Sequence, residues 1–296
     1  MGKLVGLLIL LLLFSELGQS SQWRNPREVI GDPTLARLQQ GRKELSLGEK
    51  EDLQKYGYTG LEVMTYLDDN LDPGGWDADV FRRTVRISAR GLIQNEIWLI
   101  KMKYAYPEYR ALLTYDGIRP GEVKDRLGGV NLFPPKAKGS AGFSHVYLRS
   151  RGFDQREEGA VYLVDLQRPR RLRPTDPQDN WSGTVLSWDD FRWREPWEEE
   201  HRILGEDTLR GSPCLVIESR HLDPHYYLSR RVTWVEKIHF TDLHEEQFDR
   251  QGQLWKVADQ GWERVMPWGY WAKRYDYWTD LSSGQSSAVE YFEWRF

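Results

Sequence analysis

Hydrophobic positions in this chain change their spacing near residue 76, from the spacing of a helix to that of β-strands. Between residues 59 and 75, apolar residues recur three and four positions apart, which predicts a helix with one apolar stripe. Thr59 and Glu62 stand three positions apart, as in a capping box, so the helix is expected to begin there. The Pro and Gly residues at 73–75 are expected to end it. The stripe consists of Leu61, Met64, Leu67 and Leu71.

After Trp76, apolar and polar residues alternate, which is typical of β-strands with one buried face. Trp98, Ile100 and Met102, for example, share one face of a strand. Because the links between successive strands are short, the strands are expected to pair antiparallel. The predicted fold class is α+β, mainly β: a curved antiparallel sheet with a helix or two packed on it. Strands are expected within residues 81–87, 98–104, 109–115, 143–147, 161–166, 215–217, 232–234, 240–248, 254–257, 275–278 and 289–296.

The N-terminus has the three-part plan of a secretory signal peptide. Lys3 precedes an apolar run at residues 4–14, and the small residues Gly18 and Ser20 follow, so cleavage is expected after Ser20. The run is shorter than the roughly 20 residues that span a bilayer; an uncleaved anchor is the alternative. We therefore expect a signal peptide at 1–20, a polar and weakly packed extension at 21–56, and one domain at 57–296. The mature protein is expected to be soluble and exported.

Composition excludes several classes of protein. The chain has 45 acidic and 41 basic side chains. The resulting net charge of −4 gives no support to a nucleic-acid partner. The 14 Trp, 15 Tyr and 10 Phe residues bury enough area to exclude a disordered chain. Cys214 is the one cysteine, which excludes an internal disulfide and a cysteine-rich zinc site. An apolar strand follows it, so a buried thiol is expected rather than a nucleophile.

Two segments carry a family resemblance. The first runs from residue 161 to 191 as a strand, a basic turn and two aromatic motifs, with the sequences VYLVDLQR, PRRLR, WSG and SWDDF. The second, residues 204–218, contains the turn GSPC, and the strand RRVTWV follows at 230–235. With the helix that begins at Thr59, this order resembles the LolA-like outer-membrane lipoprotein-sorting proteins over roughly residues 57–296. The chain departs from their pattern at Gly183-Thr184-Val185, where they have Gly-Ser-Asp, and in a Pro/Lys/Gly-rich stretch at 134–142.

The resemblance implies an incomplete β-barrel whose concave face is covered by helices and whose apolar hollow holds acyl chains. It implies a lipid or lipoprotein cargo, with an inner-membrane transporter and an outer-membrane acceptor as partners, and no cofactor. Candidate residues lining the hollow are the apolar sides of alternating strands, although the sequence does not show which side faces inward. These residues are Trp98, Ile100, Met102, Leu113, Leu215, Ile217 and Trp234.

Two further groups of side chains are candidates for contact with an amphiphile. Aromatic residues in an irregular segment form either a flap over the hollow or a loop that plugs the core, and the two interpretations carry equal weight. A basic turn suits an anionic headgroup, although a solvated surface is the favoured interpretation. The flap candidates are Trp181, Trp188, Phe191, Trp193 and Trp197, and the basic residues are Arg168, Arg170, Arg171 and Arg173.

No arrangement in the sequence predicts a metal site or a catalytic motif. Pro224 argues against a helix that would bring His221 and His225 to one face. His244 shares a strand face with two carboxylates, and exposed strand residues are the favoured interpretation. Neither a nucleophile elbow, a P-loop nor a dinucleotide fingerprint occurs. The sequence therefore favours a non-enzymatic periplasmic carrier or chaperone for a lipid, an acyl chain or another amphiphile. The alternatives are a secreted glycan-binding protein or glycosidase, and a structural subunit of an envelope complex.

Overall fold

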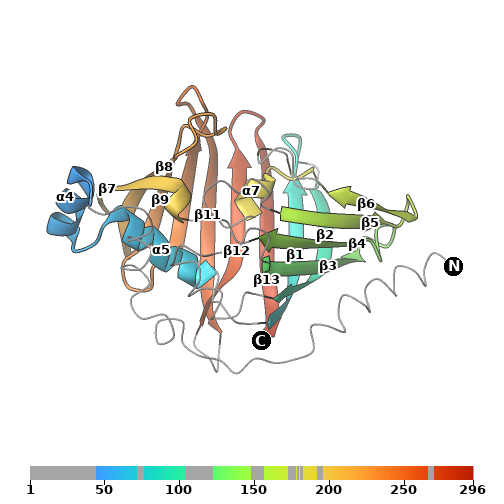
Figure 1. Cartoon of the computed structure of the whole chain (residues 1–296). Helices are drawn as coiled ribbons and strands as arrows, with labels where there is room; N and C mark the ends of the chain where they lie inside the picture. Colours follow the sequence, from blue (N-terminus) through green and yellow to red (C-terminus); the bar gives the residue numbers. More distant parts are fainter. Residues whose placement is uncertain are drawn as a thin grey trace.

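The computed structural model describes residues 45–71, 77–91, 93–103, 123–147, 157–172, 178, 180, 183–191, 196–265 and 270–295. Within these residues, thirteen strands form one antiparallel sheet (Figure 1). The strands are β1 (Asp77–Ile87), β2 (Ile93–Lys103), β3 (Val123–Phe133), β4 (Ala141–Tyr147), β5 (Glu157–Leu163), β6 (Arg168–Leu172), β7 (Glu199–Leu209), β8 (Ser212–His221), β9 (Arg230–Glu236), β10 (Asp242–Phe248), β11 (Leu254–Val265), β12 (Tyr270–Asp280) and β13 (Gln285–Arg295). The helical elements are α4 (Leu47–Tyr56), α5 (Gly60–Leu71), the short α7 (Trp188–Phe191) and the 3₁₀ turn η2 (Pro196–Glu198).

Strand order follows the chain except at one junction. The sheet runs β6-β5-β4-β3-β2-β1-β13-β12-β11-β10-β9-β8-β7, so β1 pairs with the last strand, β13. Among the described strands, β6 and β7 are the two edges, and the sheet is curved but not closed. Figure 1 shows α5 and α7 on one side of it and α4 beside its β7 edge. The predicted fold class, a curved antiparallel sheet with helices on the concave face, is confirmed.

Helix α5 begins as the sequence predicts. The Thr59 amide donates a hydrogen bond to Glu62 Oε2 at 2.6 Å, and the Glu62 amide donates to Thr59 Oγ1 at 3.1 Å. These two bonds satisfy amides that a helix N-terminus otherwise leaves unpaired. The helix ends at Leu71, immediately before the predicted stop. The capping box and the stop signal therefore locate both ends of α5 correctly.

Helix α4 lies within the segment that the sequence predicts to be weakly packed. It has a capping box of its own, formed by Ser46 and Glu49. Asp52, which is buried, accepts a hydrogen bond from the amide of Ile203 in β7 at 3.0 Å. This end of the extension is therefore tied to the edge of the sheet more closely than its polarity suggests. The expected signal peptide and residues 21–44 of the extension lie outside the described residues. No helix in the described part is long and apolar enough to cross a bilayer.

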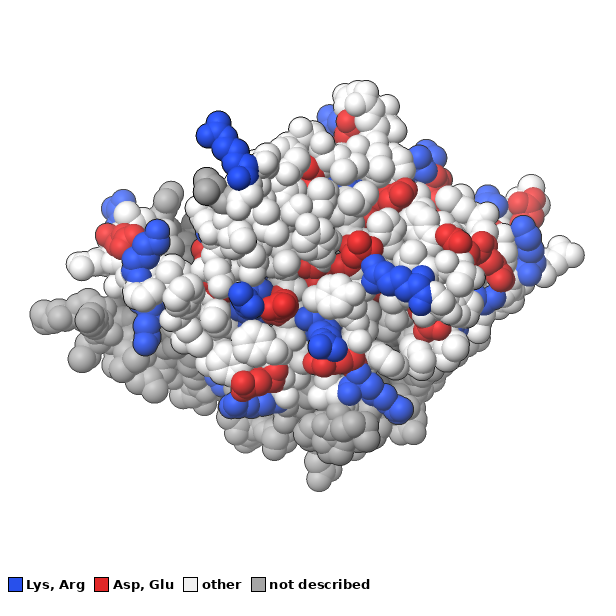
Figure 2. Space-filling view, turned by 180° about the vertical axis from the view of Figure 1, so that it is seen from behind, with Lys and Arg blue, Asp and Glu red and all other residues white. Residues whose placement is uncertain are grey.

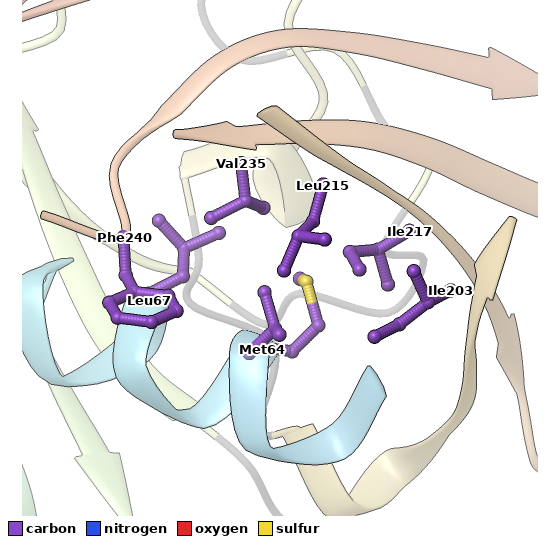
Figure 3. Close-up of a cluster of buried hydrophobic side chains, with 8 residues drawn as sticks. Met64, Leu67, Ile203, Leu215, Ile217, Val235 and Phe240 are labelled. Carbon is purple, nitrogen blue, oxygen red and sulfur yellow. The ribbon is translucent and has the colours of Figure 1, made fainter. Parts of the chain in front are cut away.

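Two apolar clusters lie on the concave face. Under α5, Met64 and Leu67 point toward Leu215, Ile217 and Val235 (Figure 3). Leu215 pairs directly with Val235 in the β8–β9 ladder, and directly paired residues share a face of the sheet. The first cluster consists of Val63, Met64, Leu67, Ile203, Leu215, Ile217, Val235 and Phe240. The second consists of Val185, Leu186, Ala258, Trp278 and Val289.

The opposite, convex face carries charges of both signs. Figure 2, which views the molecule from behind, shows Lys and Arg interspersed with Asp and Glu. Arg83 and Glu290 form one exposed pair at 3.5 Å, and Arg210 and Asp259 form another. Exposed pairs of this kind contribute little to stability. The mixed charge of this face gives no support to a polyanionic partner.

Candidate functional site

The expected lining residues are divided between the two faces of the sheet. Leu215 and Ile217 lie on the concave face, packed beneath α5. Ile100 pairs with Val80, and Trp98 pairs with Arg82; this register places both β2 residues on the concave face, away from α5. Trp234 lies on the convex face, because it pairs with Val216, and Val216 points to the face opposite that of its neighbours Leu215 and Ile217. There its Nε1 donates to Asp207 Oδ2 at 2.9 Å.

The remaining candidates are described only in part. Met102 lies in β2, but its side chain is outside the described residues, as is the whole of Leu113. Of the flap candidates, Trp188 and Phe191 bound α7 and Trp197 lies in η2, whereas Trp181 and Trp193 fall outside. Of the basic residues, Arg168 is exposed where β6 begins, Arg170 and Arg171 follow in that edge strand, and Arg173 falls outside.

A cavity of about 100 Å³ lies between the helical elements and the centre of the sheet. It differs from the apolar hollow that the resemblance implies, because most of its described lining is polar or charged. The lining residues come from α5 (Met64, Leu67, Asp68), α7 (Asp189, Asp190), η2 (Pro196) and six strands (Glu199, His201, Arg231, Asp242, Glu245, Gln260, Lys273, Asp276, Trp278, Tyr291). None of the sequence-predicted lining residues is among them.

On one side of the cavity a buried arginine bridges two carboxylates. Arg231 in β9 donates to Glu245 in β10 at 3.0 Å, and its other guanidinium nitrogens donate to both oxygens of Glu199 in β7. All three side chains are buried. A charge removed from water costs several kcal/mol unless it is paired, so this cluster fixes the relative positions of three strands.

On the second side, the carboxylate of Asp190 ties α7 to the sheet. Lys256 in β11 donates to Asp190 Oδ2 at 3.0 Å, and Gln247 in β10 donates to Oδ1 at 2.7 Å. The Ser187 amide also donates to Asp190 Oδ2, at 2.7 Å, which caps the short helix. Lys256 is among the most deeply buried side chains described. The bond between Lys256 and Asp190 therefore holds the ammonium group in place and fixes α7 to the sheet.

On the third side, Asp242 in β10 and Asp276 in β12 flank Lys273. Lys273 Nζ lies 2.8 Å from Asp276 Oδ1 and 3.7 Å from Asp242 Oδ2. Burial raises the pKa of Asp242 to about 6; Lys273 opposes that shift, and the carboxylates of Asp276 and Glu245 add to it. Burial lowers the pKa of Lys273, but the two aspartates outweigh it and raise that pKa above the ordinary value. Burial also raises the pKa of the Tyr291 hydroxyl, helped by Asp276. The pKa of Asp242 therefore moves toward neutral pH.

Histidines and the cysteine have structural partners. Because a carbonyl only accepts, His201 Nε2 donates to the Pro196 carbonyl at 2.7 Å, and its Nδ1 accepts from Ser219 Oγ at 2.8 Å. His244 pairs with Asp259 at 3.0 Å on the convex side. Within the described part of the chain, no group of three or more His, Cys, Asp or Glu is placed to hold a metal ion. Cys214 is buried, as predicted, and burial raises the pKa of its thiol.

One side chain of the cavity has an unused acceptor. Gln260 in β11 is 2% exposed and lines the cavity, and its Oε1 has no hydrogen-bond partner. It pairs with Asp276 in the β11–β12 ladder, so both side chains lie on the concave face. A buried acceptor without a donor costs about 1–3 kcal/mol. This position therefore favours a ligand or an ordered water that brings a donor.

The sequence offers one weak signal for the cavity. In strand β10, DLHEEQF, polar residues occupy both faces, so the period of two that marks a half-buried strand is absent. A strand that is polar on both sides and still lies inside a sheet points to a buried polar interior. The partners of those residues come from β7, β9, β11 and α7, and their pairing depends on tertiary structure rather than on local spacing.

An open, curved antiparallel sheet with helices on its concave face defines a LolA-like fold. A family model for proteins described as uncharacterized matches residues 134–296, more than half of the chain, and the chain belongs to that family. No curated protein matches the sequence.

Three solved structures share the fold. A domain described as an outer membrane lipoprotein-sorting protein, from Vibrio parahaemolyticus, is 19% identical over 80% of this chain and 92% of its own, with a TM-score of 0.65. A DUF1329 family protein from Desulfovibrio piger is 18% identical over 80% and 91%, with a TM-score of 0.67. A LolA superfamily protein from Nitrosomonas europaea is 14% identical over 80% and 93%, with a TM-score of 0.56. The predicted LolA-like resemblance is thereby confirmed at the level of the fold.

Proposed function

We propose that the protein is a periplasmic carrier or chaperone that binds a lipid, a lipoprotein acyl chain or another amphiphile on the concave face of its sheet. The observation that carries the proposal is helix α5, which covers part of an open, curved sheet through an apolar cluster. Met64 and Leu67 supply the helix side of that cluster, and Leu215 and Ile217 supply the sheet side (Figure 3). The proposal involves no catalytic step.

An acyl chain can replace α5 on chemical grounds. The cluster is held by burial of aliphatic surface, which is non-directional, and a guest methylene buried there contributes about 0.8 kcal/mol. A chain of about ten methylenes would thus supply about 8 kcal/mol. That lies within the range of about 4.5–9 kcal/mol that three fully buried side chains of the helix, Val63, Met64 and Leu67, contribute at about 1.5–3 kcal/mol each. Exchange between helix and guest is therefore nearly balanced, which suits a carrier that must also release its cargo.

Loading requires α5 to move. The described cavity is small and lined mostly by polar or charged residues, whereas the aliphatic surface of Leu215 and Ile217 is covered by the helix. We therefore place the acyl chain under α5, with the helix acting as a lid. The expected membrane partners, a transporter and an acceptor, would act by taking up or supplying the guest while the lid is open.

The matched capping boxes of α5 and α4 allow a direct test. Thr59→Ala removes the cap of α5, which weakens the helix by about 1 kcal/mol. Because apparent affinity scales with the fraction of open protein, this change should raise affinity for a single-chain lysophospholipid about fivefold. Ser46→Ala removes the equivalent cap of α4 and should leave affinity unchanged. Titration calorimetry on the mature protein measures both.

A second measurement locates the guest. Hydrogen exchange with the lysophospholipid present should increase in residues 60–71 and decrease in β8 and β9, with α4 unaffected. Native mass spectrometry of protein purified from its own envelope should detect co-purifying lipid. A protein that neither carries nor binds lipid, and whose α5 exchange does not respond, would contradict the proposal. Retention on an oligosaccharide column without lipid would favour the glycan-binding alternative.

A further inference from the structure

The cavity beside α5 has a distinct chemistry of its own. Its described lining contains seven carboxyl side chains and two basic side chains, Arg231 and Lys273. Lys256 adds a third cation through its bond to Asp190. The carboxyl side chains are Asp68, Asp189, Asp190, Glu199, Asp242, Glu245 and Asp276. Carboxylates in a space of low dielectric create a negative potential, which attracts a positively charged group.

A second, independent observation points to a hydrogen-bond donor. Gln260 lines the same cavity and is almost completely buried, and its Oε1 has no donor. An ammonium group carries three N–H donors and no acceptor. Trp278 and Tyr291, which also line the cavity, present aromatic rings of the kind that attract a cation. Negative charge, an unused acceptor and aromatic rings together match an organic cation better than an anion or an apolar group.

We propose that this cavity binds the alkylammonium group of an amphiphile. The volume of about 100 Å³ has room for several water molecules, which is also enough for an ammonium group with a short carbon stem. Met64 and Leu67 line the cavity and also belong to the apolar cluster. An ammonium group in the cavity therefore directs its attached hydrocarbon chain toward the aliphatic surface of Leu215 and Ile217, which α5 covers. The inference rests on the proposed function for the place of that chain, and on the cavity alone for recognition of the ammonium group.

The test compares ligands that differ only in the polar end. Decylamine, decanol and decanoate are titrated against the mature protein at neutral pH. Decylamine should bind at least tenfold more tightly than decanol, and decanoate should bind most weakly. Equal binding of decylamine and decanol would overturn the ammonium site and leave the carrier proposal standing. Failure of all three to bind would count against both.

A variant tests the acceptor. Gln260→Leu removes the amide and should reduce the preference for decylamine over decanol about tenfold, with decanol affinity unchanged. Because the wild-type acceptor is unsatisfied, this variant should unfold at a midpoint no lower than the wild type. Gln94→Leu, in the exposed part of β2, is the matched control and should keep the preference. An unchanged preference in Gln260→Leu would mean that water serves the acceptor, and would overturn the assignment.

Two further ligands distinguish the sources of an ammonium group. Lysophosphatidylethanolamine presents it on a lipid headgroup, and ethanolamine presents it as a free amine. Binding of the lysolipid alone, with dependence on Gln260, supports a lipid headgroup. Binding of ethanolamine with the same dependence supports a site for a soluble amine. Binding of neither would restrict the site to simple alkylamines, and would overturn the inference if decylamine also failed the Gln260 test.

Discussion

Asp242 lies where burial and neighbouring charges act on one carboxyl group. Trp262 Nε1 donates to its Oδ1 at 2.9 Å, and Lys273 lies 3.7 Å from its Oδ2. Burial raises its pKa from 3.8 to about 6 against the attraction of Lys273, with Asp276 and Glu245 acting in the same direction as burial. Between pH 3.8 and about pH 6, the folded protein keeps a proton on Asp242 that the unfolded chain has lost, so folding and protonation are linked.

This linkage predicts the pH dependence of stability. The contribution of Asp242 to the free energy of unfolding is fully present below about pH 4 and is lost as pH rises through about 6. A shift from 3.8 to about 6 corresponds to at most about 3 kcal/mol. Asp242→Asn keeps the acceptor for Trp262 and never ionises, so it should gain stability relative to the wild type between pH 4 and 7. Urea unfolding at four pH values measures the difference.

The control is Asp165→Asn, which changes an exposed aspartate in the turn between β5 and β6. The free energy of unfolding of this variant, plotted against pH, should stay parallel to that of the wild type over the same range. If Asp242→Asn is also parallel, Asp242 is ionised in the folded protein at pH 5, and the proposed effect of burial on it is wrong.

Single residues with local signals can be predicted from the sequence, and those with distant partners cannot. Thr59 and Glu62 form hydrogen bonds with each other across three positions, and Cys214 precedes an apolar run. The helix cap and the burial of the thiol can therefore both be predicted from neighbouring residues in the sequence. Gln260 and Lys256 carry no such signal. Lys256 resembles any solvated lysine of a strand until α7 brings Asp190 to it from 66 positions away.

At the scale of elements, β11 and β12 pack closely at a glycine, Gly261 of β11. Gly261 pairs with Tyr275, and a Cβ on Gly261 would lie 2.1 Å from the Tyr275 ring. Arg210 donates to the Tyr275 hydroxyl and to the Gln260 carbonyl, each at 3.3 Å. The ring thus lies over the glycine, and Arg210 holds it there from the turn between β7 and β8. The space over Gly261 is part of how the two strands pack.

Gly261→Ala should therefore destabilise the protein by about 1–3 kcal/mol, because the tyrosine ring must move to admit the methyl group. Gly205→Ala is the matched control: Gly205 lies in β7, and a Cβ there meets nothing within 4 Å. It should leave stability unchanged or raise it by a few tenths of a kcal/mol, since glycine is unfavourable inside a strand. Guanidinium unfolding measures both, and equal losses would show that the ring contact carries no strain.

Periodicity predicts elements better than it predicts their faces. The three- and four-residue spacing finds α5 and its buried stripe, and the period of two finds most of the strands. The register of β9 against β8 decides which face of the sheet carries Trp234. Trp234 lies on the convex face, whereas Leu215, which is also large and apolar, lies on the concave face. Alternation gives two sets of side chains in each strand, and only the packing of α5 decides which set is buried.

At the scale of the molecule, the apolar clusters and the buried ion pairs of the described residues lie in one half of the sheet. Both apolar clusters involve strands from β7 to β13, and the ion pairs of Arg231 and Lys256 lie in the same half. In β3, described side chains such as Leu127 and Phe133 are exposed. Strand order alone does not reveal this difference, because the β-ladder is continuous from β6 to β7. The helices α5 and α7 pack on the half that contains the clusters.

Local stability should follow that distribution. Opening of a strand costs less where fewer apolar contacts must be broken, so backbone amides exchange faster there. In the mature protein without ligand, amides of β3–β6 should exchange faster than those of β8–β12, although both sets are paired within one ladder. Hydrogen exchange followed by mass spectrometry measures this for each strand. Equal protection across the sheet would mean that backbone pairing dominates, and that α5 covers the sheet without stabilising it. Faster exchange confined to β3–β6 would instead identify β7–β13, with α5 and α7, as the rigid frame on which a lid can open.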